Sequence, residues 1–126
     1  MILAMEKNFE RLENVIKIQA EAFLLDANEF YPFGSYINMK DEIVPVAAYL
    51  EGDRPPSAPL IALLEKRFKT DTTNYKAAAM AIDISININE EIYDAIELRF
   101  FEPNKNVFKK HIKYKVKDGC VQFVDI

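Results

Sequence analysis

The sequence has very few of the residues that carry most recognisable protein chemistry: one cysteine, one histidine and three glycines in 126 residues. A single cysteine, Cys120, allows no intramolecular disulfide, which fits a reducing compartment, so we expect a cytoplasmic protein. Zinc sites usually need several cysteine or histidine ligands, and the acidic residues lack EF-hand spacing. With so few glycines there is also no phosphate-binding loop. We therefore expect no metal and no cofactor.

The sequence also has little that would direct the chain to a membrane or to nucleic acid. Residues Met1 to Lys7 contain no basic region followed by a long apolar run, so we expect no secretory signal. No apolar stretch reaches the ~20 residues that a transmembrane helix needs, so we expect no membrane partner. The net charge of −4 disfavours nucleic-acid binding, because phosphate contacts need a basic surface.

What the chain does have is the composition of one folded domain. Hydrophobic residues make up 50% and charged residues 29% of the sequence, which is a typical globular balance. A chain of this length can bury roughly two thirds of its unfolded surface and so form its own core. No repeat, low-complexity tract or linker divides it. We expect residues 1–126 to form a single domain.

Two segments have the three- and four-residue spacing of amphipathic helices. The first runs from about Leu3 to Ala27, and its apolar stripe consists of Met5, Phe9, Leu12, Ile16, Ala20 and Phe23. The stripe of the second consists of Leu60, Leu63, Leu64 and Phe68. Ser57 can cap the second helix, and Pro59 suits its first turn. Each stripe predicts a helix that packs on a sheet.

The other segments alternate apolar and polar residues, which is typical of strands. The longest alternation runs from Ala78 to Ile88, and Asp118-Gly119 is a strong signal for the turn of the last hairpin. An earlier hairpin, with its turn near Lys40-Asp41, would place Ile37 opposite Val44 and Phe33 opposite Ala48. Pro45 cannot donate a ladder hydrogen bond, so it should lie on an edge strand or with its nitrogen turned outward.

The predicted order of elements is therefore α-β-β-α-β-β-β-β. Strands joined by short turns predict an antiparallel sheet in an α+β fold. We expect two helices packed on one face of that sheet, and the opposite face mostly exposed. The buried face should carry Met80, Ile82, Ile84, Leu98, Phe100, Tyr114 and Phe123.

The outward side chains of the long strands include four candidate binding residues: Asp83, Glu97, Arg99 and His111. A hairpin loop within residues 102–106 would place Glu97 opposite His111, with Asp83 beside Glu97 or, after a register change, beside Arg99. A carboxylate next to histidine can tune general acid–base chemistry. The same alternation also describes a solvated sheet face with cross-strand ion pairs.

An aromatic cluster, Phe30-Tyr31-Pro32-Phe33, gives two further candidate binding residues, Tyr31 and Phe33. Such a cluster can present a rigid aromatic binding surface, or it can seal the junction between helix and sheet. A series of lysines around His111 could likewise attract an acidic partner, or protect an edge strand from aggregation.

The cysteine and the histidine cannot form a catalytic pair in the predicted fold. The Asp118-Gly119 turn places Cys120 opposite Lys117, and His111 lies about six strand positions away, or ~20 Å. A nucleophile and its base must lie within ~3 Å of each other. We therefore predict no catalytic residue.

The segment Glu29 to Gly34, followed by Ala77 to Ser85 and by Asp94 to Glu97, resembles a group of small bacterial proteins of uncharacterised function. In that group a Phe-Tyr-Pro-Phe-Gly stretch follows a first helix. The resemblance covers most of the chain and implies a stand-alone α+β domain. It supplies no catalytic residues.

These observations lead us to expect a non-catalytic protein-interaction or regulatory domain, immunity- or adaptor-like, that binds a partner protein or a second copy of itself. The alternative is a small enzyme or ligand-binding domain that uses the row of Asp83, Glu97 and His111. A water-shielded pocket around that row would favour the alternative, whereas an open, flat sheet would favour a protein interface.

Overall fold

The computed structural model describes residues 2–47, 56–105 and 107–125, and its elements follow the predicted order, α-β-β-α-β-β-β-β. The helices are α1 (Ile2–Ala27) and α2 (Ser57–Thr70). The strands are β1 (Phe33–Asn38), β2 (Ile43–Ala47), β3 (Tyr75–Ile88), β4 (Glu91–Phe101), β5 (Phe108–Lys117) and β6 (Cys120–Asp125). Among these residues no helix is both long and apolar enough to cross a membrane.

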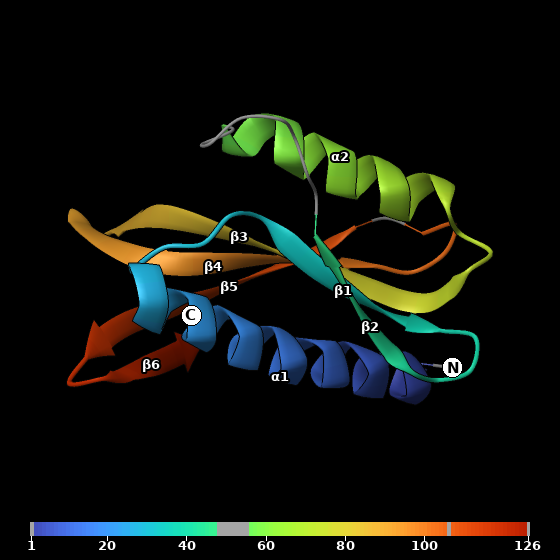
Figure 1. Ribbon diagram of the computed structural model, residues 1–126, viewed down its shortest axis with the longest axis horizontal. Coiled ribbons are helices and arrows are strands. Elements are labelled where there is room, and N and C mark those ends of the chain that lie inside the picture. Colours follow the sequence, from blue (N-terminus) through green and yellow to red (C-terminus); the bar gives the residue numbers. More distant parts are fainter. Residues whose placement is uncertain (1, 48–55, 106, 126) are drawn as a thin grey trace.

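The strands form one antiparallel sheet in the order β2-β1-β3-β4-β5-β6, which confirms the α+β prediction (Figure 1). The sheet curls around α1, because this helix contacts β6 at one edge as well as β1 and β3. The second edge strand is β2. Pro45 belongs to β2 and therefore lies on an edge strand, as predicted.

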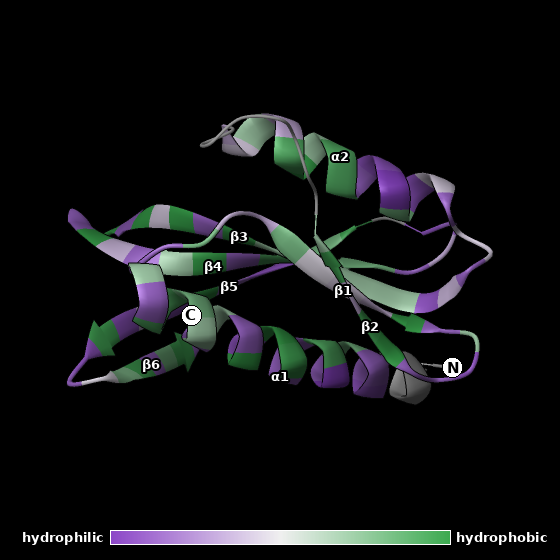
Figure 2. Cartoon of the chain, viewed as in Figure 1, coloured by the Kyte–Doolittle hydropathy of each residue, from purple (hydrophilic) through white to green (hydrophobic). Residues whose placement is uncertain are grey.

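The buried stripe of α1 departs from the predicted stripe near the C-terminal end of the helix. Three residues of the predicted stripe are fully buried: Leu12, Ile16 and Ala20. The next buried residue is Leu24, whereas Phe23 is 45% exposed. Hydrophobic and hydrophilic residues alternate along the helix (Figure 2). The helix packs over a row of fully buried small residues of β3: Ala77, Ala79 and Ala81.

The second helix lies on the opposite face of the sheet from α1 (Figure 1), so the prediction that both helices share one face is wrong. Leu64 and Phe68 of α2 pack with Met80, whereas α1 packs with the alternate residues of β3. The cause is that every residue from Ala77 to Ile82 is buried. A strand that is apolar on both faces presents one set of side chains to each covering layer.

The residues that were predicted to form one core face are therefore divided between two. Met80, Ile82 and Ile84 pack on the side of α2, whereas Leu98, Phe100, Tyr114 and Phe123 pack on the side of α1.

Gly34 of β1 allows α2 to pack closely on the sheet. A Cβ atom at this position would lie 2.6 Å from the carbonyl oxygen of Ala79 and 3.2 Å from the ring of Phe68. Real Cβ atoms do not approach backbone atoms so closely, so any larger residue would push the strands or the helix apart. This explains physically why a glycine follows the aromatic cluster.

The last two hairpins have the predicted registers. Val116 pairs with Val121 around the Asp118-Gly119 turn, and Glu97 pairs with His111. Both turn residues have positive φ angles, 54° and 73°, as a two-residue hairpin loop of this type requires.

The β1–β2 hairpin is one residue out of the predicted register. Ile37 pairs with Ile43 rather than with Val44. The predicted partner of Phe33, Ala48, lies outside the described residues.

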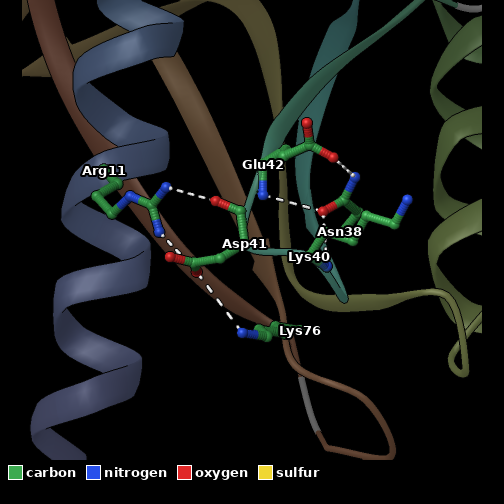
Figure 3. Close-up of polar contacts among 6 residues, drawn as sticks. All are labelled: Arg11, Asn38, Lys40, Asp41, Glu42 and Lys76. Atoms are coloured by element: carbon green, nitrogen blue, oxygen red, sulfur yellow. Dashed lines mark hydrogen bonds and ion pairs between the residues drawn. The ribbon is translucent and has the colours of Figure 1, made fainter.

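The turn itself explains the shift (Figure 3). The side-chain oxygen of Asn38 accepts hydrogen bonds from the backbone N–H groups of Lys40 and Glu42, both at 2.9 Å. Asp41 has a φ of 66°, and Arg11 of α1 donates to its carboxylate at 3.0 Å and to its carbonyl at 3.1 Å. A left-handed last residue is typical of three-residue hairpin loops. The loop that ends at Asp41 is therefore one residue longer than the predicted two-residue loop, and the pairing of the strands shifts by one.

We predict that Gly34→Ala lowers the free energy of unfolding by ~1–3 kcal/mol, as overpacking of a core usually does. Because the closest atom is a backbone oxygen, Phe68→Leu should not rescue the variant. Chemical denaturation measures both effects. Ser85→Ala, at an exposed position of β3, is the control and should change stability by less than ~0.5 kcal/mol. If Gly34→Ala proved as stable as the wild type, the close approach of Gly34 to Ala79 and Phe68 would be contradicted.

Candidate functional site

The structure separates the predicted polar row into two parts on opposite faces of the sheet. Glu97, Arg99 and His111 lie together on the side of α2. Asp83 pairs with Ile96, so its side chain points to the side of α1. The proposed neighbourhood of Asp83 and Glu97 is therefore wrong, because the two residues occupy opposite phases of the pleat.

Glu97 is the centre of an ion-pair network between α2 and the sheet. Its two carboxylate oxygens accept from Arg99 Nε at 2.8 Å and bond His111 Nε2 at 2.9 Å. Arg99 also contacts Glu65 of α2. Burial alone would raise the pKa of Glu97, but the hydrogen bonds with His111 and Arg99 outweigh it and lower this pKa. The carboxylate is thus held ionised with both oxygens engaged, which suits a structural ion pair better than a general base.

Asp83 forms a separate polar contact beneath the aromatic cluster. The hydroxyl of Tyr114 donates to Asp83 Oδ1 at 2.6 Å. Burial raises the pKa of Asp83, partly offset by this bond and by a hydrogen bond with the backbone of Phe30. Burial and the neighbouring carboxylate also raise the pKa of Tyr114. The bond with Tyr114 therefore links Asp83 of β3 to β5, on the side of the sheet where Phe30 and Tyr114 are buried.

A hollow of about 410 Å³ opens beside this cluster, and we call it the aromatic groove. It lies where the C-terminal end of α1 and the segment leading into β1 meet the end of β2 and the start of α2. Its lining residues are Phe23, Asp26, Ala27, Glu29, Phe30, Tyr31, Pro32, Phe33, Ala47 and Ser57. A hollow of this size can hold a bulky side chain or a small ligand.

The chain geometry at the end of α1 forms this groove. The N–H of Asn28 bonds the carbonyl of Leu24 at 2.8 Å, and Asn28 itself has a φ of 61°. A left-handed residue at this position ends a helix. The chain then runs through Pro32 into β1, so the aromatic cluster turns back beside the helix.

The aromatic residues of the groove serve two different purposes. Phe30 and Phe33 are buried and pack edge to face, with ring centroids 5.4 Å apart. Phe23 packs its ring on Phe33 at 5.2 Å, yet Phe23 and Tyr31 remain 45% and 50% exposed. The two interpretations of the cluster therefore apply to different residues: part of it is core, and part is accessible surface.

Sequence reasoning placed Tyr31 and Phe33 at this site but missed Phe23, Asp26 and Glu29. Phe23 was assigned to the buried stripe, but Leu24 takes the core position at this turn of the helix and Phe23 is 45% exposed. Since Leu24 continues the four-residue spacing from Ala20, that spacing was the signal that Phe23 faces outward.

The single histidine and the single cysteine of the chain do not line the groove. His111 and the exposed Cys120 lie on other elements, β5 and β6. Among the described residues, no group of three or more His, Cys, Asp or Glu side chains is arranged to hold a metal ion. Comparison of the chain with family models, curated proteins and solved structures gives no match in any of the three.

We predict a distinct pH dependence for Asp83→Asn. Because burial raises the pKa of Asp83 above 3.8, the folded chain binds this proton more tightly than the unfolded chain. The resulting stabilisation of the folded chain is fully present below the ordinary pKa of an aspartate. It is lost as the pH rises through the raised pKa of Asp83 in the folded chain. The unfolding free energy of the wild type should therefore fall relative to that of Asp83→Asn as the pH rises above 3.8.

Chemical denaturation at a series of pH values measures this difference. Asp118→Asn, in the exposed turn between β5 and β6, controls for the loss of one carboxylate. The inferred burial of this carboxyl group would be contradicted if the unfolding free energy of the wild type stayed constant, or rose, relative to that of Asp83→Asn as the pH increases.

Proposed function

We propose that this chain is a non-catalytic protein-interaction domain that binds a short segment of a partner protein in the aromatic groove. The observation that carries the proposal is the exposure of Phe23 and Tyr31 beside an apolar hollow. Aromatic side chains bury much area at little cost in conformational entropy, and they are enriched among the residues that dominate binding energy.

The rigidity of the groove supports this role. Phe30 and Phe33 are packed in the core, and their rings meet edge to face. A wall that is already ordered loses little entropy when a ligand binds, so more of the contact energy becomes affinity.

The alternative function, a small enzyme using the polar row, has less support. Asp83 lies on the other face from Glu97 and His111, and both oxygens of Glu97 are engaged. A regulatory or adaptor role, exerted by capturing a segment of another protein, requires no reaction chemistry. The single cysteine supports a cytoplasmic location for such a role.

We predict that selection from a displayed random-peptide library yields peptides with a shared bulky apolar residue. Their binding to Tyr31→Ala should be weaker by about tenfold or more, the ~1.4 kcal/mol or more expected of an aromatic contact at the centre of an interface. Fluorescence anisotropy with purified variants measures this loss. Circular dichroism confirms that each variant is folded.

Phe108→Ala is the matched control, because Phe108 is an aromatic residue of similar exposure, 56%. Phe108 lies away from the groove, near the other end of α1. Its ring stacks on Phe100, and Phe100 in turn packs against Phe9 of α1. Phe9 and Phe23 are separated by roughly 21 Å along α1, at ~1.5 Å per residue. If the selected peptides bind Tyr31→Ala as tightly as they bind Phe108→Ala, the groove is not the binding site.

A further inference from the structure

We propose that the segment bound in the aromatic groove is cationic: it carries a bulky apolar side chain next to an arginine or lysine. This inference rests on the proposed function and specifies its ligand. The apolar side chain would fill the hollow between Phe23 and Tyr31, and the positive group would lie at the rim.

The first argument is the charge of the groove itself. Among the described residues, its lining includes two carboxylates, Asp26 and Glu29, and no lysine or arginine. Both side chains are exposed. Neither takes part in an ion pair with any residue in the described ranges. A cation at the rim would thus meet carboxylates that no neighbour among those residues already neutralises.

The second argument is that more negative charge lies close behind the rim. The charges of Asp94 and Glu29 both contribute to the raised pKa of Asp83. Both carboxylates therefore lie within electrostatic range of Asp83. Because Glu29 also lines the groove, the charges of Asp83 and Asp94 add to the negative potential at its rim.

The third argument is the direction of α1. Asp26 and Ala27, which line the groove, are the last residues of this long helix. The final carbonyl groups of a helix carry a partial negative charge. No basic residue occupies the last turn of α1 to compensate it. The helix therefore adds to the attraction for a cation at the same end of the molecule (Figure 1).

The basic surface of the chain lies elsewhere, which makes this end distinctive. Four lysines project from one side of β5, the side that faces α2: Lys109, Lys113, Lys115 and Lys117. Lys113 lies over the ring of Tyr93 at 4.4 Å. The chain is therefore electrostatically polarised, and a ligand that carries both an apolar and a positive group would be oriented as it approaches the groove. At the rim, Tyr31 can also receive the cation over its ring.

The test uses three short fluorescein-labelled peptides with the same central phenylalanine and leucine, flanked by arginine, by glutamine or by glutamate. Anisotropy titrations with the full chain at low salt should give the tightest binding for the arginine peptide. We expect about five- to tenfold tighter binding than for the glutamine peptide, and the weakest binding for the glutamate peptide. High salt should compress these differences, because it screens charges at the surface.

The double variant Asp26→Asn/Glu29→Gln should lose most of the preference for the arginine peptide and bind the glutamine peptide at least as tightly as the wild type does. The control is Glu10→Gln, which removes an exposed carboxylate from the first half of α1. Glu10 lies roughly 24 Å from Asp26 along the helix at ~1.5 Å per residue, beyond the ~10 Å screening length at moderate salt. This control should leave the preference for arginine unchanged.

The outcomes separate the two proposals. Equal affinity of the wild type for all three peptides would overturn the cationic ligand while leaving the apolar groove in place. If none of the peptides binds, or if all bind Tyr31→Ala as well as they bind the wild type, the groove itself fails as the binding site. Light scattering that shows a dimer whose formation needs Asp26 and Glu29 would identify the occupant as a second copy of the chain, and would also overturn the proposal.

Discussion

The burial of β3 on both faces is the constraint on which the rest of the structure depends. From Ala77 to Ile82 every side chain is buried, and the pleat divides these residues between α1 and α2. Because the side chains toward α1 are all alanines, the helix lies close to the sheet. Gly34 allows a close approach on the other side, where the Phe68 ring lies only 3.2 Å from the position that a Cβ atom would take. One strand of small residues thus places both helices, and through them the end of α1 that forms the aromatic groove.

The polar residues follow from this arrangement and not from a reaction centre. With α2 on its own face, Arg99 comes within reach of Glu65 and links the helix to β4. On the face toward α1, the partly buried carboxylate of Asp83 accepts a hydrogen bond from Tyr114. Buried polar groups need such partners. Each of these contacts holds two elements together: α2 and β4 in the first case, β3 and β5 in the second.

The sequence predicted the elements and most hairpin registers, because alternation and turn residues are local signals. It could not assign the helices to faces, since a run of six buried residues carries no alternation. The predicted register of the first hairpin is wrong by one residue. The conformation of its loop depends on the side chain of Asn38 and on Arg11, which lies thirty positions before Asp41 in the chain. The groove was found only in part: Tyr31 and Phe33 stood out as aromatic residues. Asp26 and Glu29 become neighbours of the hollow only once the end of α1 is placed.

The carboxylates at the rim of the groove have a consequence for the free chain as well as for a ligand. Exposed aromatic pairs such as Phe23 and Tyr31 favour association with any apolar surface. Charged residues beside an apolar patch oppose indiscriminate contacts, because burying them without a partner costs free energy. Asp26 and Glu29 therefore disfavour apolar ligands that bring no positive charge. In the proposed interaction, the carboxylates that oppose indiscriminate apolar contacts would also select the ligand, so both effects would have one physical origin.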